Sequence, residues 1–272
     1  IFKKYKPERV FHAAAYKHVP LMEESPHEAI KVNVLGTKNL VDLSVENGIE
    51  RFVMVSTDKA VNPTNVMGAS KRIAELYISC ASKHSEKTKF TTTRFGNVLG
   101  SNGSVIPLFK KQIDKGGPLT LTHKNITRYF MTIPEACSLV LEAGTMGQGG
   151  EIYIFDMGKS VKIFDIAKRM INLSGLKYPE DIDIKITGLR PGEKLYEELL
   201  ADGENTTKTY HDKIMIAKTQ QLDAAAVKAK IETLAIGFNE LDKPSLVASM
   251  KNLVPEYVSQ NSKFEKLDKV RL

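Results

Sequence analysis

This sequence of 272 residues has only two cysteines and lacks any long apolar run. Cys80 and Cys137 lie far apart and lack metal-ligand spacing, which argues against a disulfide scaffold and favours a reducing compartment. A membrane span needs about 18 or more consecutive apolar residues, and a charge, Gly or Pro interrupts every apolar stretch here much earlier. The sequence therefore predicts that these residues form a soluble part of the molecule.

Metal ligands are also missing as a group. By their spacing in the sequence, the histidines form no metal-ligand cluster; those considered are His18, His27, His84, His123 and His211. The 39 Lys and Arg residues exceed the 32 Asp and Glu residues and give a net charge of +7, but acidic residues lie among the basic ones along the chain. We therefore predict no metal site, and a solvated surface rather than a nucleic-acid interface.

A glycine-rich turn for a dinucleotide is the third absence. The one candidate, Gly96-Asn-Val-Leu-Gly100-Ser-Asn-Gly103, follows a predicted strand but lacks the G-x-G-x-x-G spacing, and Pro107 lies just beyond it. No acidic residue follows at the end of a next strand to hold the ribose hydroxyls. Either the protein binds no dinucleotide, or the part that holds it lies upstream of Ile1.

What the first part of the chain does contain is an alternation of short β-rich runs with helical patterns. The apolar spacing predicts strands at 9–15, 51–56 and 91–95, and helices over 26–47 and 66–84. Strands separated by helices of this length need right-handed crossovers. The pattern therefore predicts an α/β fold with a parallel sheet.

The pattern changes after Gly116-Gly117-Pro118. Strands are predicted at 119–123 and 151–156, and helices over 133–144, 163–174, 223–232 and 245–253, with a charged tail from Ser259. We place a domain boundary near residue 115, with a first domain over 1–115 and a smaller one over 116–272. The strand near 151–156 could return to the sheet of the first domain.

Polar residues directly follow the apolar strand at 51–56. Thr57, Asp58 and Lys59 deliver a hydroxyl, a carboxyl and an amine to a strand end, where an open parallel sheet forms its crevice. On position alone, a polar turn capped by Asp58 is the slightly favoured alternative. Lys71 lies one helical turn after Met67; taken alone, they would be a solvated charge and a core residue.

The run from Ser56 to Lys71 resembles the active-site segment of the extended short-chain dehydrogenase/reductases, and more narrowly that of the nucleotide-sugar 4,6-dehydratases of polysaccharide and glycan biosynthesis. Residues 12–18 resemble the cofactor-side segment after the fourth strand of that family, and 33–40 resemble its next helix. Residues 94–101 and 190–198 resemble its nucleotide-sugar and diphosphate segments. The resemblance implies a Rossmann-like doubly wound parallel sheet, incomplete here, with a smaller C-terminal α/β substrate domain.

Two departures from the family pattern carry information. The glycine loop and its strands are absent, so we expect the chain to enter a catalytic domain partway and, as a fragment, to bind NAD poorly. Met67 stands where the family at large has a catalytic Tyr, and a thioether cannot take a proton. Met at this place resembles the larger, membrane-anchored branch, which implies spans upstream and a location at the cytoplasmic face of the inner membrane.

The resemblance implies dehydration of a UDP-N-acetylhexosamine, with UDP-N-acetylglucosamine as the usual substrate, to its 4-keto-6-deoxy sugar. In that reaction a hydride leaves C4 for NAD and later returns to C6, while a base removes the C5 proton and an acid protonates the departing C6 hydroxyl. We predict Asp58 as the acid and Lys59 as the base, one proton shift from their ion pair, in a dry site that favours the neutral forms. Thr57 is predicted to relay the C4 hydroxyl proton to Lys71 or water, since Met67 cannot.

Binding roles follow from the same resemblance. Lys71 is assigned to the nicotinamide ribose, and the remaining cofactor residues are His12, Ala13, Ala14, Asn33 and Ser56. Asn97 and Arg190 are assigned to the diphosphate, where Arg190 offers a planar fork of donors. Lys17 is placed at the sugar or phosphate. Arg128 is either a further phosphate ligand or part of a surface salt bridge.

Two alternatives remain open at this point. A nucleotide-sugar 4-epimerase of the same superfamily would need only the oxidation at C4, and Asp58-Lys59 argues against it. A non-catalytic nucleotide-sugar sensor could have kept the fold and lost the Tyr. The resemblance also implies a homo-oligomer that associates through the helices predicted over 26–47 and 66–84.

Overall fold

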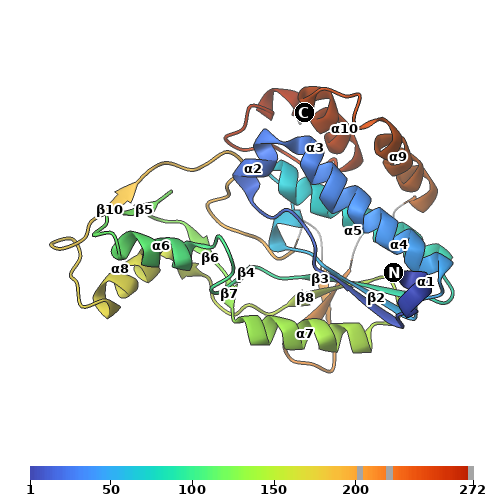
Figure 1. Ribbon diagram of the computed structural model, residues 1–272, viewed down its shortest axis with the longest axis horizontal. Coiled ribbons are helices and arrows are strands. Elements are labelled where there is room, and N and C mark those ends of the chain that lie inside the picture. Colours follow the sequence, from blue (N-terminus) through green and yellow to red (C-terminus); the bar gives the residue numbers. More distant parts are fainter. Residues whose placement is uncertain (201–204, 219–222, 269–272) are drawn as a thin grey trace.

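A six-stranded sheet forms the centre of the computed structural model, which describes residues 1–200, 205–218 and 223–268 (Figure 1). The strand order is β1-β2-β3-β8-β12-β11. The first four of these strands run parallel: β1 (Arg9–His12), β2 (Arg51–Val55), β3 (Lys89–Arg94) and β8 (Glu151–Phe155). β12 (Ile214–Lys218) and β11 (Asn205–Lys208) follow antiparallel at one edge. The α/β class with a mainly parallel sheet is thus confirmed.

Helices cover both faces of the sheet, which explains the apolar runs in its strands. Phe52, Val53 and Met54 of β2 are all buried, as the middle of a doubly covered parallel strand requires. α5 (Val66–His84) and α4 (Gly36–Glu46) lie on one face, and α7 (Ile133–Met146) lies on the other (Figure 1). β8 joins this sheet from the later part of the chain through its parallel pairing with β3.

The helix predicted over 26–47 contains a wider turn in its middle. It consists of α3 (Pro26–Ala29), a π-helical segment (Ile30–Leu35) and then α4. Asn33 is buried in the π-helical segment, and its side chain bonds to both the backbone N–H and the carbonyl of Tyr16. The wider turn thus lies where the helix holds the loop after β1. That loop begins after His12, three residues before the end of the strand predicted at 9–15.

Two C-terminal helices pack beside the sheet. α9 (Ala224–Gly237) and α10 (Lys243–Leu253) lie over α5 and share its hydrophobic cluster, to which Ile231 and Leu246 contribute (Figure 1). Phe264, in the predicted charged tail, is also buried in this cluster. These residues therefore extend the core beside the sheet, and they cover the outer side of a helix that we expected to mediate self-association.

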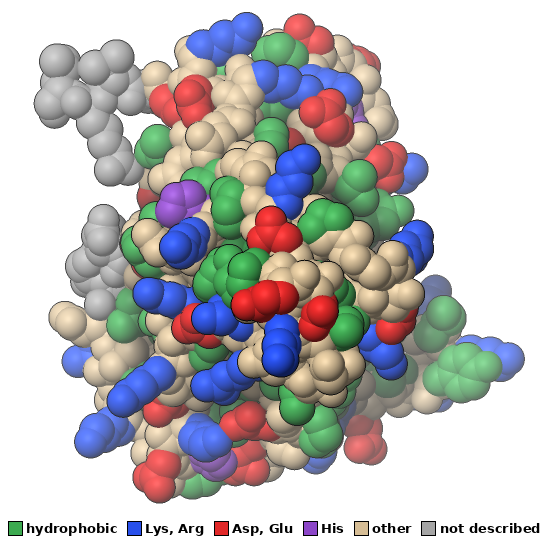
Figure 2. Space-filling view, turned by 90° about the vertical axis from the view of Figure 1, so that its left-hand side faces the viewer, with side chains coloured by type: hydrophobic (Ala, Val, Ile, Leu, Met, Phe, Trp, Pro, Cys, Tyr) green, Lys and Arg blue, Asp and Glu red, His purple; other side chains and the backbone are tan. Residues whose placement is uncertain are grey.

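A second, smaller lobe carries its own hydrophobic cluster. α6 (Val105–Ile113), β5 (Leu119–Leu121), α8 (Ile163–Leu173) and β10 (Ile184–Ile186) form it, and β5 pairs in parallel with β10 (Figure 1). Phe109 and Ile113 belong to this cluster, so α6 packs with the second lobe although it precedes residue 115. Basic and acidic side chains are interspersed on this end of the molecule (Figure 2).

Short elements complete the described chain. They are α1 (Phe2–Tyr5), α2 (Val19–Glu24), β4 (Asn97–Val98), β6 (Thr127–Arg128), β7 (Phe130–Met131), β9 (Val161–Lys162) and the 3-10 turns at Asp58–Ala60 and Glu265–Leu267. None of the helices in the described ranges is both long and apolar enough to span a membrane.

Candidate active site

The turn that follows β2 carries Thr57, Asp58 and Lys59. Its 3-10 segment begins after Thr57, whose hydroxyl accepts a hydrogen bond from the Lys59 backbone N–H at 3.3 Å. α5 lies directly against this turn at Gly68, where a Cβ would stand 2.1 Å from the Lys59 carbonyl oxygen. Because glycine has no Cβ, the helix and the turn can approach this closely. The three polar side chains are thereby fixed at the carboxyl end of the sheet.

Lys59 lies between two carboxylates. Its Nζ is 2.9 Å from Asp58 Oδ1, 3.5 Å from Glu197 Oε1 and 3.4 Å from Asn97 Oδ1. Burial by itself lowers the pKa of Lys59, but the charges of Asp58 and Glu197 outweigh it and hold this pKa above its usual value. In the free site the ion pair is therefore favoured, whereas the predicted neutral amine concerns the site with the sugar bound.

Asp58 is fully buried and uses only one of its oxygens. Oδ1 accepts hydrogen bonds from Lys59 Nζ and, at 2.8 Å, from the Thr57 hydroxyl. Within the described residues, Oδ2 has no hydrogen-bond partner, and it lies 3.1 Å from the position that a Cβ on Gly96 would take. The Thr57 hydroxyl thus donates to Asp58, whereas Lys71, its predicted relay partner, bonds elsewhere.

Lys71 reaches the end of β2 from α5. Its Nζ donates to the Val55 carbonyl oxygen at 2.8 Å, and burial lowers the pKa of Lys71 to about 8, although Glu75 opposes the shift. Ser56, assigned to the cofactor, donates its hydroxyl proton to Glu75 at 2.7 Å. Glu75 also pairs with Arg94. Ser56 therefore belongs to a buried ionic network below the site.

His12, Asn33 and the loop after β1 form the neighbouring edge of the site. The Thr37 hydroxyl donates to the Asn33 carbonyl, so the 2.8 Å contact between His12 Nε2 and Thr37 Oγ1 requires His12 to donate. Burial, aided by the charge of Lys71, lowers the pKa of His12 to about 4, which keeps the ring neutral. Ala13 and Ala14 are exposed beyond the strand end. This edge therefore offers small side chains and a neutral ring.

The predicted substrate residues are divided between two places. Asn97 faces Lys59 within the site, whereas Lys17 donates to the Ser101 hydroxyl at 3.3 Å. Arg190 is exposed over 58% of its side chain and pairs with Glu193 at 3.2 Å. Asn97 is therefore brought to the acid/base group, and Arg190 keeps donors accessible to a ligand.

Arg128 is buried, so it does not form a surface salt bridge. Its guanidinium donates to the backbone carbonyls of Thr127, Lys194 and Leu195, and its Nε lies 3.6 Å from Glu197 Oε1. The side chain therefore holds the segment after Arg190 against the site. These bonds occupy donors that we had offered to the diphosphate.

Met67 lies in the hydrophobic core with 3% of its surface exposed. Its neighbours in that cluster are aliphatic and aromatic side chains of the sheet and of the helices on this face. The alternative that Met67 is a core residue therefore agrees with its packing, and the titratable groups gathered at the site are Asp58, Lys59, Lys71 and one further carboxyl.

That further carboxyl is Glu197, which we did not predict. It lies in the segment 190–198 that resembles the family's diphosphate segment, but nothing in the sequence distinguishes it from Glu193 or Glu198.

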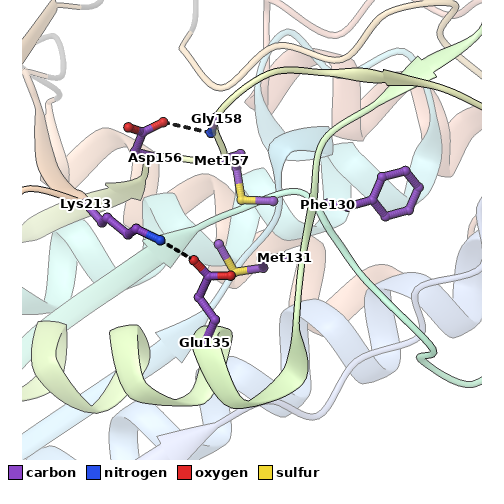
Figure 3. Close-up of a pocket in the computed structure, with 7 residues that line it drawn as sticks. All are labelled: Phe130, Met131, Glu135, Asp156, Met157, Gly158 and Lys213. Atoms are coloured by element: carbon purple, nitrogen blue, oxygen red, sulfur yellow. Dashed lines mark hydrogen bonds and ion pairs between the residues drawn. The ribbon is translucent and has the colours of Figure 1, made fainter.

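A pocket lies close to the site, on the side of Gly96. It is lined by Met157, by residues of β7 and by Glu135, which pairs with Lys213 (Figure 3). A Cβ on Gly96 would lie 3.4 Å from Met157 Cε and 3.1 Å from Asp58 Oδ2, so Gly96 adjoins both this pocket residue and Asp58.

Comparison with known proteins finds relatives in polysaccharide biosynthesis. The chain is 55% identical over 240 residues to the capsular polysaccharide biosynthesis protein CapD of Staphylococcus aureus, covering 88% of this chain and 40% of that protein. It is 40% identical to a UDP-N-acetylglucosamine 4,6-dehydratase (inverting) of Campylobacter jejuni, covering 72% of this chain and 57% of the relative. A UDP-glucose 4-epimerase of Rickettsia canadensis is 43% identical, with 71% and 55% covered. The chain thus spans less than two thirds of the length of these relatives.

A solved structure supports the fold. The X-ray structure of Pen from Bacillus thuringiensis superposes with a TM-score of 0.72 at 37% identity, covering 79% of this chain and 67% of that one. The sequence profile of the polysaccharide biosynthesis protein family matches residues 1–219. The chain belongs to this family, within the extended short-chain dehydrogenase/reductases.

Proposed function

We propose that the protein dehydrates a UDP-N-acetylhexosamine, with UDP-N-acetylglucosamine as the expected substrate, to its 4-keto-6-deoxy sugar in polysaccharide or glycan biosynthesis. The observation that carries the proposal is the buried Asp58–Lys59 pair at the carboxyl end of β2. Elimination of water needs an acid and a base near adjacent carbons, whereas epimerisation at C4 does not. The pair therefore favours a dehydratase over an epimerase.

The residues beside this pair fit the nicotinamide ribose of NAD. Lys71 carries three N–H donors and spends one on Val55, which leaves donors for the ribose hydroxyls. The exposed Ala13 and Ala14 would line the adenosine side, next to the neutral His12. NAD, when bound, would supply the hydride acceptor that makes a 4-ketone and returns the hydride at C6.

The chain's own groups would carry the proton transfers. Lys59, once neutral, takes the C5 proton, which the 4-ketone has made acidic. Asp58, once protonated, gives its proton to the C6 oxygen, which leaves as water. Asp58 Oδ1, which accepts a hydrogen bond from Lys59, would carry that proton. Arg190 and Asn97 would both hold the diphosphate, with Asn97 on the side nearer the sugar because it faces Lys59.

The test is to incubate the full-length protein with UDP-N-acetylglucosamine and NAD and to follow the sugar nucleotide by mass spectrometry. A dehydratase gives a product that has lost one water. An epimerase gives a product of unchanged mass and inverted C4, which chromatography separates. A sensor returns the ligand unchanged. Either of the last two results would contradict the proposal.

Replacement of Thr57 by valine tests the hydroxyl relay. The substitution keeps the branched shape but removes the donor to Asp58 Oδ1 and the cap of the Lys59 N–H. A hydrogen bond to a charged group is worth about 1.5–3 kcal/mol, so kcat for dehydration should fall by about 10- to 100-fold. Full activity of Thr57→Val in the mass-spectrometric assay would count against the relay. Thr57→Ser, which keeps the hydroxyl, is the matched control.

A further inference from the structure

Two buried carboxyls face the single amine of Lys59. The Glu197 side chain is 3% exposed, and its Oε1 lies 3.5 Å from Lys59 Nζ and 3.6 Å from Arg128 Nε. Its Oε2 is buried and has no hydrogen-bond partner among the described residues, as is also true of Asp58 Oδ2. The site therefore holds one carboxyl more than an acid/base pair needs.

The position of Glu197 is built into the fold. Arg128, on β6, donates to the backbone carbonyls of Lys194 and Leu195 and so fixes the segment that carries Glu197. Lys194 is also anchored, since its Nζ donates to the carbonyl of Val61, which directly follows the turn at Asp58–Ala60. Glu197 is thus held against Lys59 from both sides, which an incidental surface glutamate would not be.

The charges around Glu197 decide which form it takes. Lys59, Arg128 and Lys194 face it as cations, and Asp58 faces it as an anion. Burial raises the pKa of Glu197 and the charge of Asp58 adds to this rise, so that the pKa stays above its usual value despite the three cations. When Glu197 is ionised, it joins Asp58 in keeping the proton on Lys59.

We propose that Glu197 is a positioning residue that works in its uncharged form and thereby allows Lys59 to act as a base. With Glu197 protonated, Asp58 alone holds the proton of Lys59. That proton can then pass from Lys59 Nζ to Asp58 Oδ1 along their 2.9 Å hydrogen bond. The N–H bond breaks, an O–H bond forms, and the proton of Glu197 stays in place. The inference rests on the proposed function, because it explains how the neutral pair needed for elimination arises.

The pH dependence of turnover tests this assignment. As the pH rises through the pKa of Glu197, wild-type Glu197 loses its proton, Lys59 keeps its own, and kcat falls. Glu197→Gln has the same shape and is always uncharged, so the ratio of its kcat to the wild-type kcat should rise about tenfold per pH unit above that pKa. The ratio removes the contribution of Lys71, whose pKa of about 8 affects both proteins. A ratio that stays constant with pH overturns the proposal.

Two further variants secure the comparison. Glu198→Gln removes the adjacent carboxyl, which is 49% exposed and pairs with Lys194, and its profile should coincide with that of the wild type. Glu197→Met is an uncharged replacement of similar volume that cannot hydrogen-bond, and it should reproduce the rising ratio if Glu197→Gln fails to fold. A rise with Glu198→Gln as large as with Glu197→Gln would also overturn the proposal.

A spectroscopic measurement separates this inference from the proposed function. Infrared spectra of the wild-type protein, recorded as a pH series, should contain the carbonyl band of a protonated carboxyl that is absent in Glu197→Gln and retained in Glu198→Gln. Absence of the band in the wild type, or its persistence in Glu197→Gln, overturns the inference whatever the protein catalyses. Failure of the wild type to dehydrate the sugar, with the band present, contradicts the proposed function instead.

Discussion

Asp58→Asn should lower kcat for dehydration by about 100-fold or more, since an amide cannot give a proton to the leaving C6 oxygen. The base remains in this variant. Loss of the Asp58 charge also removes an anion that raises the pKa of Lys59, so the amine can lose its proton to water instead of to Asp58. Deuterium from solvent D2O should therefore still enter the sugar at C5, while no water is lost.

Lys59→Met should lose both events. Methionine keeps the length of the side chain but has no amine, so neither C5 exchange nor elimination should proceed at more than about one hundredth of the wild-type rate. Mass spectrometry of the recovered sugar nucleotide reads both events in one sample. The two variants thus separate the acid from the base, which a loss of overall activity alone would not.

Folding controls complete this experiment. Removal of Lys59 leaves Asp58 and Glu197 without their shared amine, so circular dichroism and a thermal melt should accompany each assay. Lys213→Met is the matched control, because it removes another lysine–glutamate pair, with Glu135, at an exposed position. Near-normal dehydration by Asp58→Asn or Lys59→Met would contradict the assignment of acid and base.

The sheet and the polar turn that carries Asp58 and Lys59 were predictable because local sequence patterns specify them. The buried strand at Arg51–Val55 and the helix at Val66–His84 have apolar spacings that leave little choice, and the polar run after the strand falls where a parallel sheet opens. The site residues next to that turn in sequence therefore lie near it in space. Thr57, Asp58 and Lys59 are the clearest case.

Contacts between distant parts of the chain could not be predicted in the same way. Glu197 reaches Lys59 across 138 positions only because Arg128 holds its segment, and no periodicity reports such a bond. Helices α9 and α10 contain many apolar residues, but nothing in their spacing indicated that these two helices cover α5. The hydrogen bond from the Ser56 hydroxyl to Glu75 is a further contact that the sequence did not indicate.

Arg94→Met should produce the largest loss of stability. Arg94 is 1% exposed and binds the fully buried Glu75 through two hydrogen bonds, Nε to Oε1 at 3.0 Å and Nη2 to Oε2 at 2.7 Å. Without Arg94, the buried Glu75 keeps only Arg72 as a charged partner, and removing one partner of a buried pair costs about 3–5 kcal/mol. The free energy of unfolding from urea denaturation at neutral pH should fall by that amount.

The acid sensitivity of the protein should change with the same substitution. Burial raises the pKa of Glu75, but the charge and hydrogen bonds of Arg94 outweigh it, with help from Arg72, and the folded-state pKa is about 2. A carboxyl whose pKa is depressed on folding contributes stability above its unfolded value of 4.5 and loses it as the pH falls towards 2. That contribution is about 3 kcal/mol in the wild type and should be largely absent from Arg94→Met. The free energy of unfolding should therefore fall less in Arg94→Met than in the wild type as the pH is lowered from 4.5 to 2.

A double variant distinguishes the ion pair from simple packing. Arg94→Met combined with Glu75→Met replaces both charges by apolar side chains and should recover much of the stability that Arg94→Met loses, because no charge is left buried alone. Glu75 also anchors Ser56 and Arg72, whose partners would then be lost, so recovery should stay incomplete. A double variant less stable than Arg94→Met would show that the network's hydrogen bonds, rather than the unpaired charge, dominate the loss.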